Sequence, residues 1–228
     1  IFSREIRPLV DAYTHRIICS RVAKTKFQYR LYTDDGLRIT AAFLTPNAAV
    51  TPSDVVFTTQ RYLHQPTCVG YGDMPDGSDG MFFGTSDGFV MREDVGTSFD
   101  GQEIYGLLRL HFNHLKSPAI KKRYRKLDIE LDSPSRIELS FRQRFDYADG
   151  EYATGESLPV ESLGRGAAWD ASQWDRFYWS LPSSTRVEAN IDGVGRNMGL
   201  MVYHVSSFDE PFTLQGVLLQ YTPLGIKR

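Results

Sequence analysis

Strict alternation of apolar and charged side chains is the sequence feature that most constrains this fold. Leu127, Ile129 and Leu131 alternate with three acidic residues, and a second alternating run begins at Ile137, after a Ser-Pro-Ser turn. Successive side chains of a strand point to opposite faces of the sheet, so a period of two predicts half-buried strands. We expect these two runs to pair as an antiparallel hairpin.

The first half of the chain is also expected to form strands, around two Asp-Gly turns. Asp-Gly between apolar runs indicates a hairpin, because glycine accepts the positive φ that a tight turn requires. Gly36 and Gly88 lie 52 positions apart, close to the period of one four-stranded propeller blade. Propeller-like blades and two unrelated hairpins are the alternatives. Only residues 4–12 could form a helix, and Pro8 limits its length.

These patterns predict an all-β chain: propeller-like blades, in an incomplete set, followed by an antiparallel β-sandwich. Residues 1–115 would form about two blades, residues 116–126 a basic linker, and residues 127–228 the sandwich. Closed propellers contain four to eight blades, so we expect the remaining blades to come from outside these residues.

Composition excludes several classes of protein. The 228 residues carry a formal net charge of −2, whereas a dedicated nucleic-acid binder is usually clearly basic. Two cysteines cannot form a disulfide framework. The chain contains no apolar run near the roughly 20 residues of a membrane-spanning helix, so no membrane span is expected.

Positive charge is concentrated in one short stretch, where six of residues 116–126 are basic. The stretch is either a solvated linker or a contact for phosphates or an acidic partner. The candidate contacts are Lys121, Lys122, Arg123, Arg125 and Lys126.

Aromatic residues are concentrated in another stretch, because all three tryptophans fall within residues 169–179. Such a segment can close the end of a sandwich core, anchor a protein interface, or stack on sugar rings. The candidate subunit-interface residues are Trp169, Trp174, Phe177 and Trp179.

Other motifs lack the context that their chemistry needs. Residues 84–88 match G-x-S-x-G, but a strand rather than a helix is expected to follow. The glycine-rich residues 193–199 also lead into an apolar strand pattern, which predicts a turn rather than a phosphate loop. Asp73, Asp76 and Asp79 do not have the spacing of an EF-hand calcium loop. We therefore expect no catalytic residue, no cofactor and no metal site, and the chain is not expected to be an enzyme.

Three stretches, spread over most of the chain, carry a resemblance to a known family. They are residues 26–32 (KFQYRLY); residues 84–88 (GTSDG), 97–104 (TSFDGQEI) and 122–127 (KRYRKL); and residues 169–170 (WD), 174–175 (WD), 191–197 (IDGVGRN), 211–217 (PFTLQGV) and Tyr221. They resemble the C-terminal part of tail hub proteins of short-tailed bacteriophages, also called tail nozzle or packaged-DNA stabilisation proteins.

The resemblance implies a structural virion protein of the phage tail. Such subunits form a homo-oligomeric ring, with six members by family resemblance, below the portal and its adaptor. Double-stranded DNA passes through this ring during ejection, and assembly takes place in the host cytoplasm. The alternative function is that of a carbohydrate-binding or receptor-binding β-protein of a tail, supported by the tryptophan segment and by a faint likeness of Ser86-Asp87-Gly88 to a sialidase Asp-box.

Overall fold

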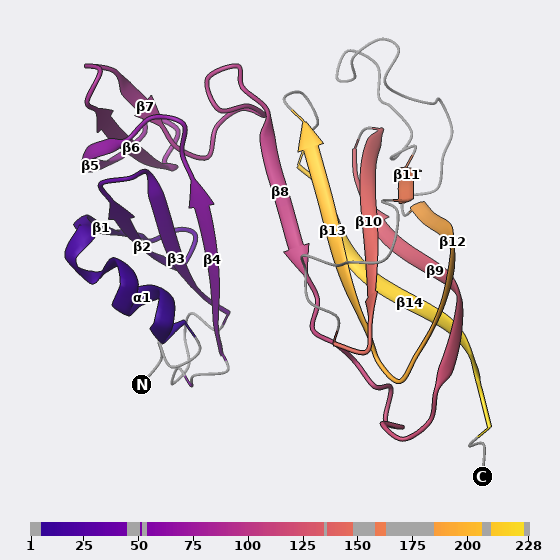
Figure 1. Cartoon of the computed structure of the whole chain (residues 1–228). Helices are drawn as coiled ribbons and strands as arrows, with labels where there is room; N and C mark the ends of the chain where they lie inside the picture. The colour runs from indigo at the N-terminus through magenta and orange to yellow at the C-terminus, as the bar shows by residue number, and fades with distance from the viewer. Residues whose placement is uncertain are drawn as a thin grey trace. The chain divides into compact units, whose positions relative to one another are not determined.

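The computed structural model describes residues 6–44, 51, 54–134, 136–147, 158–162, 185–206 and 211–225 (Figure 1). These residues form an all-β protein with one short α-helix. The chain divides into two compact units, Ile1–Gly96 and Thr97–Arg228. Among the described residues, no helix has the length and apolar character needed to cross a membrane.

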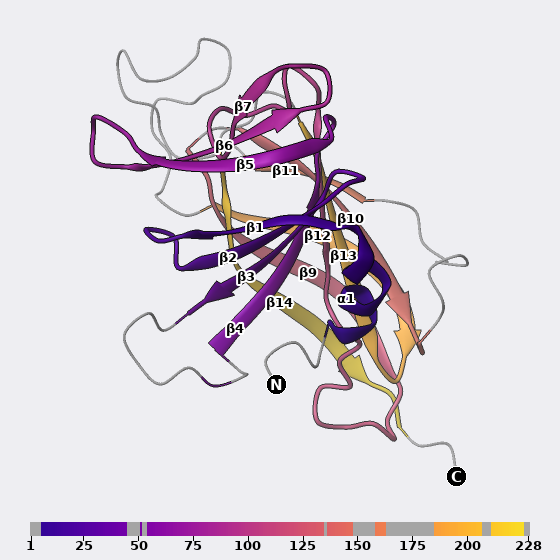
Figure 2. The same ribbon diagram turned by 90° about the vertical axis from the view of Figure 1, so that its left-hand side faces the viewer.

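The first unit contains a four-stranded sheet in which each strand pairs with the next along the chain (Figure 2). Its elements are α1 (Arg7–Tyr13), the 3₁₀ turn η2 (Thr14–Arg16), β1 (Ile17–Ala23), β2 (Gln28–Thr33), β3 (Leu37–Phe43) and β4 (Val55–Arg61). Pro8 lies in the first turn of α1, where its missing N–H has no intrahelical partner to lose.

A three-stranded sheet completes the first unit, formed by β5 (Pro66–Asp73), β6 (Asp79–Thr85) and β7 (Val90–Arg92). Both expected Asp-Gly hairpins are confirmed: Gly36 joins β2 to β3 with φ of 83°, and Gly88 joins β6 to β7 with φ of 86°. Ala23 and Tyr32 of the first sheet pack with Val69, Met81 and Phe83 of the second in one small core. The two hairpins therefore belong to sheets that share apolar contacts.

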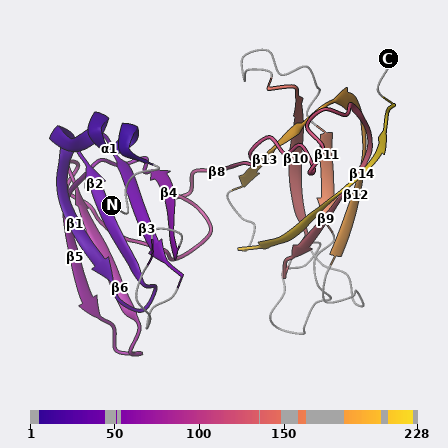
Figure 3. The same ribbon diagram turned by 90° about the horizontal axis from the view of Figure 1, so that it is seen from below.

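The second unit contains two antiparallel sheets that contribute to one core (Figure 3). The four-stranded sheet has the order β11-β10-β13-β8, and the three-stranded sheet has the order β12-β9-β14. The strands are β8 (Ile104–Arg109), β9 (Lys122–Asp132), β10 (Ile137–Phe145), β11 (Leu158–Ser162), β12 (Thr185–Gly195), β13 (Met198–Ser206) and β14 (Thr213–Pro223).

The prediction that the two strands flanking the Ser-Pro-Ser turn pair as a hairpin is wrong, although both strands are present. β9 pairs with β12 and β14, whereas β10 pairs with β11 and β13. The apolar side chains of β9 and β10, among them Ile129 and Phe141, meet in the common core instead of lying side by side in one sheet. Alternation specifies which side chains are buried, but it leaves open whether the partner strand is a neighbour or lies across the core.

The observed boundary between the units also differs from the expected one. The units divide between Gly96 and Thr97, and β8 pairs with β13 of the second unit. Residues 122–126, expected to be linker, form the first half of β9, whose Tyr124 is fully buried in the core. High positive charge concealed the alternation of this part of the strand.

The turn expected near residue 195 is confirmed: Arg196 and Asn197 connect β12 to β13, which lie in different sheets. Gly193 is required for packing beside this connection. A Cβ atom at Gly193 would lie 2.1 Å from the ring of Phe145, closer than any side chain can approach. The glycines here let a strand approach an aromatic ring closely, rather than bind phosphate.

We expect the substitution Ile129→Ala to destabilise the second unit strongly. Ile129 is fully buried between the two sheets, so its truncation removes apolar contacts and leaves a cavity. The free energy of unfolding should fall by about 2–5 kcal/mol, measured by urea titration followed by circular dichroism. The matched control is Leu218→Ala in β14 of the same sheet, where the side chain is 48% exposed and the loss should stay below about 0.5 kcal/mol. Equal losses would contradict the assignment of the core.

Candidate functional site

The five basic residues predicted as contacts do not all face the same way, because successive side chains of β9 point to opposite sides of the sheet. Lys121 is exposed just before β9, whereas Lys122 is buried and Arg123 and Arg125 point outward. Lys126 is half-buried on the outer side. The basic run is therefore not a single charged surface.

Lys122 is a structural residue, which corrects its expected role as a contact. Only 1% of its surface is exposed. Its Nζ atom donates hydrogen bonds to the carbonyl oxygens of Ser117 at 2.7 Å, Ile120 at 3.2 Å and Arg196 at 2.9 Å. Three carbonyls satisfy all three donors of an ammonium group, so Lys122 joins the segment before β9 to the turn after β12 and presents no charge to a ligand.

The outward members of the run lie beside polar partners on neighbouring strands. Arg123 is 3.6 Å from Asp192, Lys126 forms an ion pair with Glu188, and the Nε atom of Arg125 donates to Thr222 Oγ1 at 3.1 Å. Acidic residues of β12 therefore lie beside two of the four basic residues of β9.

Asp128 extends this pairing along the same outer face. Its carboxylate accepts hydrogen bonds from Arg186 and from Gln220, the latter at 3.1 Å. The hydrogen bond from Arg186 lowers the pKa of Asp128 below its ordinary value. This face of the three-stranded sheet therefore carries cross-strand charge pairs rather than a concentrated positive patch.

The aromatic candidates Trp169, Trp174, Phe177 and Trp179 lie outside the described residues. Their expected role at a subunit interface stays a prediction.

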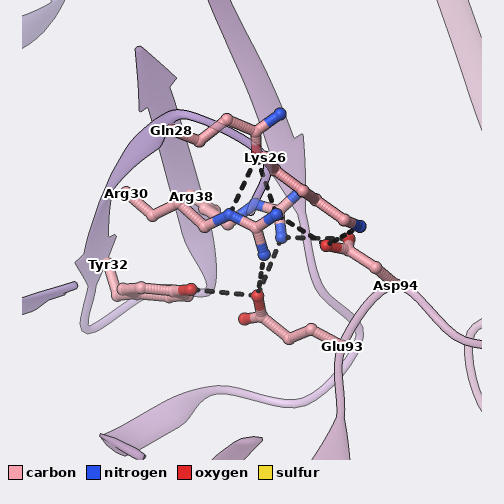
Figure 4. A network of polar contacts seen from close by, with 7 residues as sticks. All are labelled: Lys26, Gln28, Arg30, Tyr32, Arg38, Glu93 and Asp94. Atoms are coloured by element: carbon pink, nitrogen blue, oxygen red, sulfur yellow. Dashed lines mark hydrogen bonds and ion pairs between the residues drawn. The ribbon is translucent and has the colours of Figure 1, made fainter. Parts of the chain in front are cut away.

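A cluster of buried charges in the first unit was not foreseen from the sequence (Figure 4). Arg30 and Tyr32 of β2 and Arg38 of β3 surround Glu93, which follows β7. Tyr32 and Arg38 are direct cross-strand partners, while the backbone N–H of Glu93 donates to the carbonyl of Met81 at 2.8 Å. Both sheets of the unit thus position the cluster.

One carboxylate oxygen is the centre of this cluster. Glu93 Oε2 accepts hydrogen bonds from Arg30 Nη1 at 2.6 Å, Arg38 Nη1 at 2.9 Å and the Tyr32 hydroxyl at 3.0 Å. The side chain of Glu93 is fully buried, and the guanidinium groups of the two arginines are almost fully buried. Burying ions carries a large desolvation cost, which these short charged hydrogen bonds offset.

Asp94 forms the second, partly exposed half of the cluster. Its Oδ2 atom accepts from Arg30 Nη2 at 2.6 Å and from Lys26 Nζ at 2.8 Å. Gln28 Oε1 accepts the remaining bonds of the Arg30 fork, from Nε at 3.1 Å and from Nη2 at 2.7 Å. Arg30 therefore uses all three of its nitrogens, and its orientation is fixed.

The ionisation states in the cluster support one another. Burial alone would raise the pKa of Asp94, but the hydrogen bonds from Lys26 and Arg30 lower it to about 2. Burial raises the pKa of Tyr32, and the neighbouring Glu93 raises it further, so the hydroxyl stays protonated as a donor. A fully buried Glu93 does not face a ligand, and the cluster works as a cross-link between the two sheets.

Sequence reasoning could have found a trace of this cluster. Arg30 and Tyr32 are two positions apart in a strand and so share a face, and the adjacent acids Glu93 and Asp94 follow the short strand β7. The sequence contains no sign that these positions meet, because 55 residues separate Arg38 from Glu93.

The weaker motifs take simple structural roles. Residues 86–88 form the turn between β6 and β7, and a strand follows the G-x-S-x-G motif as expected. Asp76 accepts hydrogen bonds from the backbone N–H of Ser78 at 2.9 Å and from its hydroxyl at 2.6 Å, as in a local turn. Within the described residues, no three His, Cys, Asp or Glu side chains gather to hold a metal ion.

Comparison of the chain with protein families and with curated proteins finds no match.

We expect Glu93→Gln to destabilise the first unit more than a typical surface substitution. The change removes the fully buried counterion of Arg30 and Arg38 and leaves them only Asp94, and breaking a buried pair costs about 3–5 kcal/mol. Urea unfolding measures this loss. The control is Asp11→Asn, which removes an exposed partner of Arg7 and should cost less than about 1 kcal/mol. A Glu93→Gln variant as stable as the control would contradict a cross-linking role.

The pKa of Asp94 predicts a specific loss of stability in acid. Its folded pKa of about 2 lies below its ordinary value of 3.8, so the unfolded chain binds the proton more readily. The stabilisation from Asp94 should be complete above about pH 5 and should disappear as the pH falls from about 4 to 2. Urea unfolding of the wild type and of Asp94→Asn at several pH values measures it. The stability difference between the two should shrink across this interval, and a constant difference would contradict the assignment.

Proposed function

We propose that this chain is a structural subunit of a bacteriophage tail, within a hub or nozzle ring that forms part of the DNA-ejection channel below the portal and adaptor. The first unit supplies propeller-like blades, and the second supplies an antiparallel β-sandwich. The proposal starts from the three sequence stretches that resemble tail hub proteins.

The strand order of both units is consistent with this architecture. The meander β1-β2-β3-β4 has the strand number and the sequential pairing of a propeller blade. The two sheets of the second unit share a core to which β9, β10, β12 and β13 all contribute, as in a sandwich.

The single observation that carries the proposal of a homo-oligomer is the edge strand β8. It lies at the end of its sheet, so one side of its backbone has no strand partner among the described residues. Tyr105 and Leu107, which are 75% and 62% exposed, share a face with the half-exposed Val205 of β13. An exposed apolar edge strand is a template for pairing with another chain, and in a ring that chain is the next subunit.

The first test of the proposal is composition of the virion. Mass spectrometry of purified phage tails should detect this chain in multiple copies together with portal and adaptor proteins. Native mass spectrometry of the purified chain should show a closed ring, six-membered by family resemblance. A chain that stays monomeric and is absent from purified tails would refute the proposal.

The variant Leu107→Lys should weaken ring formation, because it places a charge on the exposed apolar edge. Analytical ultracentrifugation should show a larger share of monomer than in the wild type. The association constant derived from it should fall by about tenfold or more. Leu218→Lys is the matched control: it adds the same charge at an exposed leucine of the other sheet and should leave assembly unchanged. If both variants assemble like the wild type, β8 is not the subunit contact.

A further inference from the structure

We propose that the first unit binds an amphiphile with one alkyl chain and an anionic head group, such as a fatty carboxylate. The alkyl chain lies in an apolar cleft between α1 and the four-stranded sheet, and the head group lies beside Arg21 and Lys24 at the edge of that sheet. This inference goes beyond the proposed function and does not depend on it, because all of the residues concerned belong to the first unit.

The cleft has a volume of about 340 Å³. Val10 of α1 and Ile6, which precedes the helix, form one wall, and side chains of β2, β3 and β4 form the floor. Pockets that hold small molecules have volumes of roughly 300–1,000 Å³. The cleft is therefore large enough for a small ligand or for one chain of a larger one.

The strand register explains why the sheet is hollow at this point. Tyr29 of β2 is opposite Ala41 of β3, and Ala41 is opposite Phe57 of β4. Side chains in such a row share one face of the sheet, so the small Ala41 lies between two aromatic rings. The depth of the cleft therefore depends on the small side chain at position 41.

The chemistry of the cleft selects an apolar occupant. Each described residue that lines it is aliphatic or aromatic, and Tyr29 is the only one among them with an ionisable side chain. A charged group placed there would lose its hydration without gaining a compensating hydrogen bond. An ordered water needs two to four polar partners, which these side chains do not supply. An alkyl chain, in contrast, is stabilised by leaving water for such a site.

The helix beside the cleft is held weakly. α1 has seven residues, none of them buried, and no side chain caps its N-terminus. It also has no acidic residue in its first turn and no basic residue in its last turn. A helix this short depends on packing for its stability, so local opening of α1 admits a chain to the cleft.

A second cavity, of about 510 Å³, adjoins the cleft, because Tyr29 lines both. The charged residues among its described lining are Arg21 and Lys24, and we call it the basic cavity. Lys24 Nζ lies 5.8 Å from the centre of the Tyr71 ring, and Arg21 Nε donates a hydrogen bond to the carbonyl of Val69 at 3.1 Å. These contacts position two positive charges at one end of the cleft, where they complement an anionic head group.

One row of side chains connects the cleft to the basic cavity. Val22 of β1 is opposite Tyr29, and the row continues through Ala41 to Phe57. Val22 and Tyr29 are 53% and 39% exposed, so this part of the row is accessible to a ligand. Three interstrand spacings make the row roughly 14 Å long. An alkyl chain that follows the row places its head group beyond Val22, at the basic cavity.

Isothermal titration calorimetry of the full chain with decanoate, below its micelle-forming concentration, tests this inference. We expect saturable binding at one site per chain. Octanoate, which is shorter by two methylene groups, should bind about tenfold more weakly, because each methylene that leaves water adds to the affinity. Absence of saturable binding, or equal affinity for the two chain lengths, would overturn the inference.

The variant Ala41→Phe should fill the cleft and lower the affinity for decanoate by about tenfold or more. The matched control is Val56→Phe in β4, which adds a ring on the opposite face of the same sheet, at a residue that is 44% exposed. This control should change affinity by less than about twofold. Midpoints of thermal unfolding verify folding, and Ala41→Leu replaces Ala41→Phe if the latter does not fold. Unchanged affinity in the folded variant at position 41 would place the ligand elsewhere and overturn the inference.

A charge reversal tests the position of the head group. Lys24→Glu should weaken decanoate binding by about three- to tenfold at low salt. It should leave the binding of decanol, the uncharged analogue, unchanged. Lys121→Glu makes the same change at an exposed lysine of the second unit and should leave both affinities unchanged. If Lys24→Glu affects decanoate and decanol equally, or affects neither, the basic cavity does not hold the head group and the inference is overturned.

Discussion

The need to pair buried charge is the physical constraint on which both units depend. In the first unit, Glu93 neutralises Arg30 and Arg38 between two sheets whose shared apolar core is small. Removing the carboxylate would leave these two buried cations with Asp94, which is partly exposed, as their remaining acidic partner. In the second unit, Lys122 is buried only because three backbone carbonyls accept its hydrogen bonds. Charge in this chain therefore joins strands that apolar packing alone would hold less firmly.

Local sequence signals predicted individual strands and turns well. The Asp-Gly hairpins at Gly36 and Gly88 and the burial of Leu127, Ile129 and Leu131 are all present, since these features depend only on neighbouring residues. The pairing of β9 with β12 and β14 could not be predicted in the same way. It depends on contacts between residues far apart in the sequence, and alternation does not encode the identity of the partner strand.

The candidate site shows the same limit more sharply. Counting basic residues identified the run at residues 116–126, but the count did not reveal which side chains have partners. Strand direction buries Lys122, and cross-strand acids balance Arg123 and Lys126. The cluster around Glu93 was missed because its members come from three separate segments, and only the folded topology brings them together.

A net charge of −2 initially argued against contact with nucleic acid, and the distribution of ion pairs changes the meaning of that number. Several of the cations described here lie beside acids, among them Arg16, Lys26, Lys126 and Arg186, so they add little to the local field. Other described cations, among them Arg21, Arg125 and Arg142, have no acid within ion-pair distance among the described residues. A surface that carries only a few unpaired guanidinium groups attracts phosphate without holding it tightly. Low net charge is thus compatible with a conduit for DNA, provided that the unpaired charge lies where the strand passes.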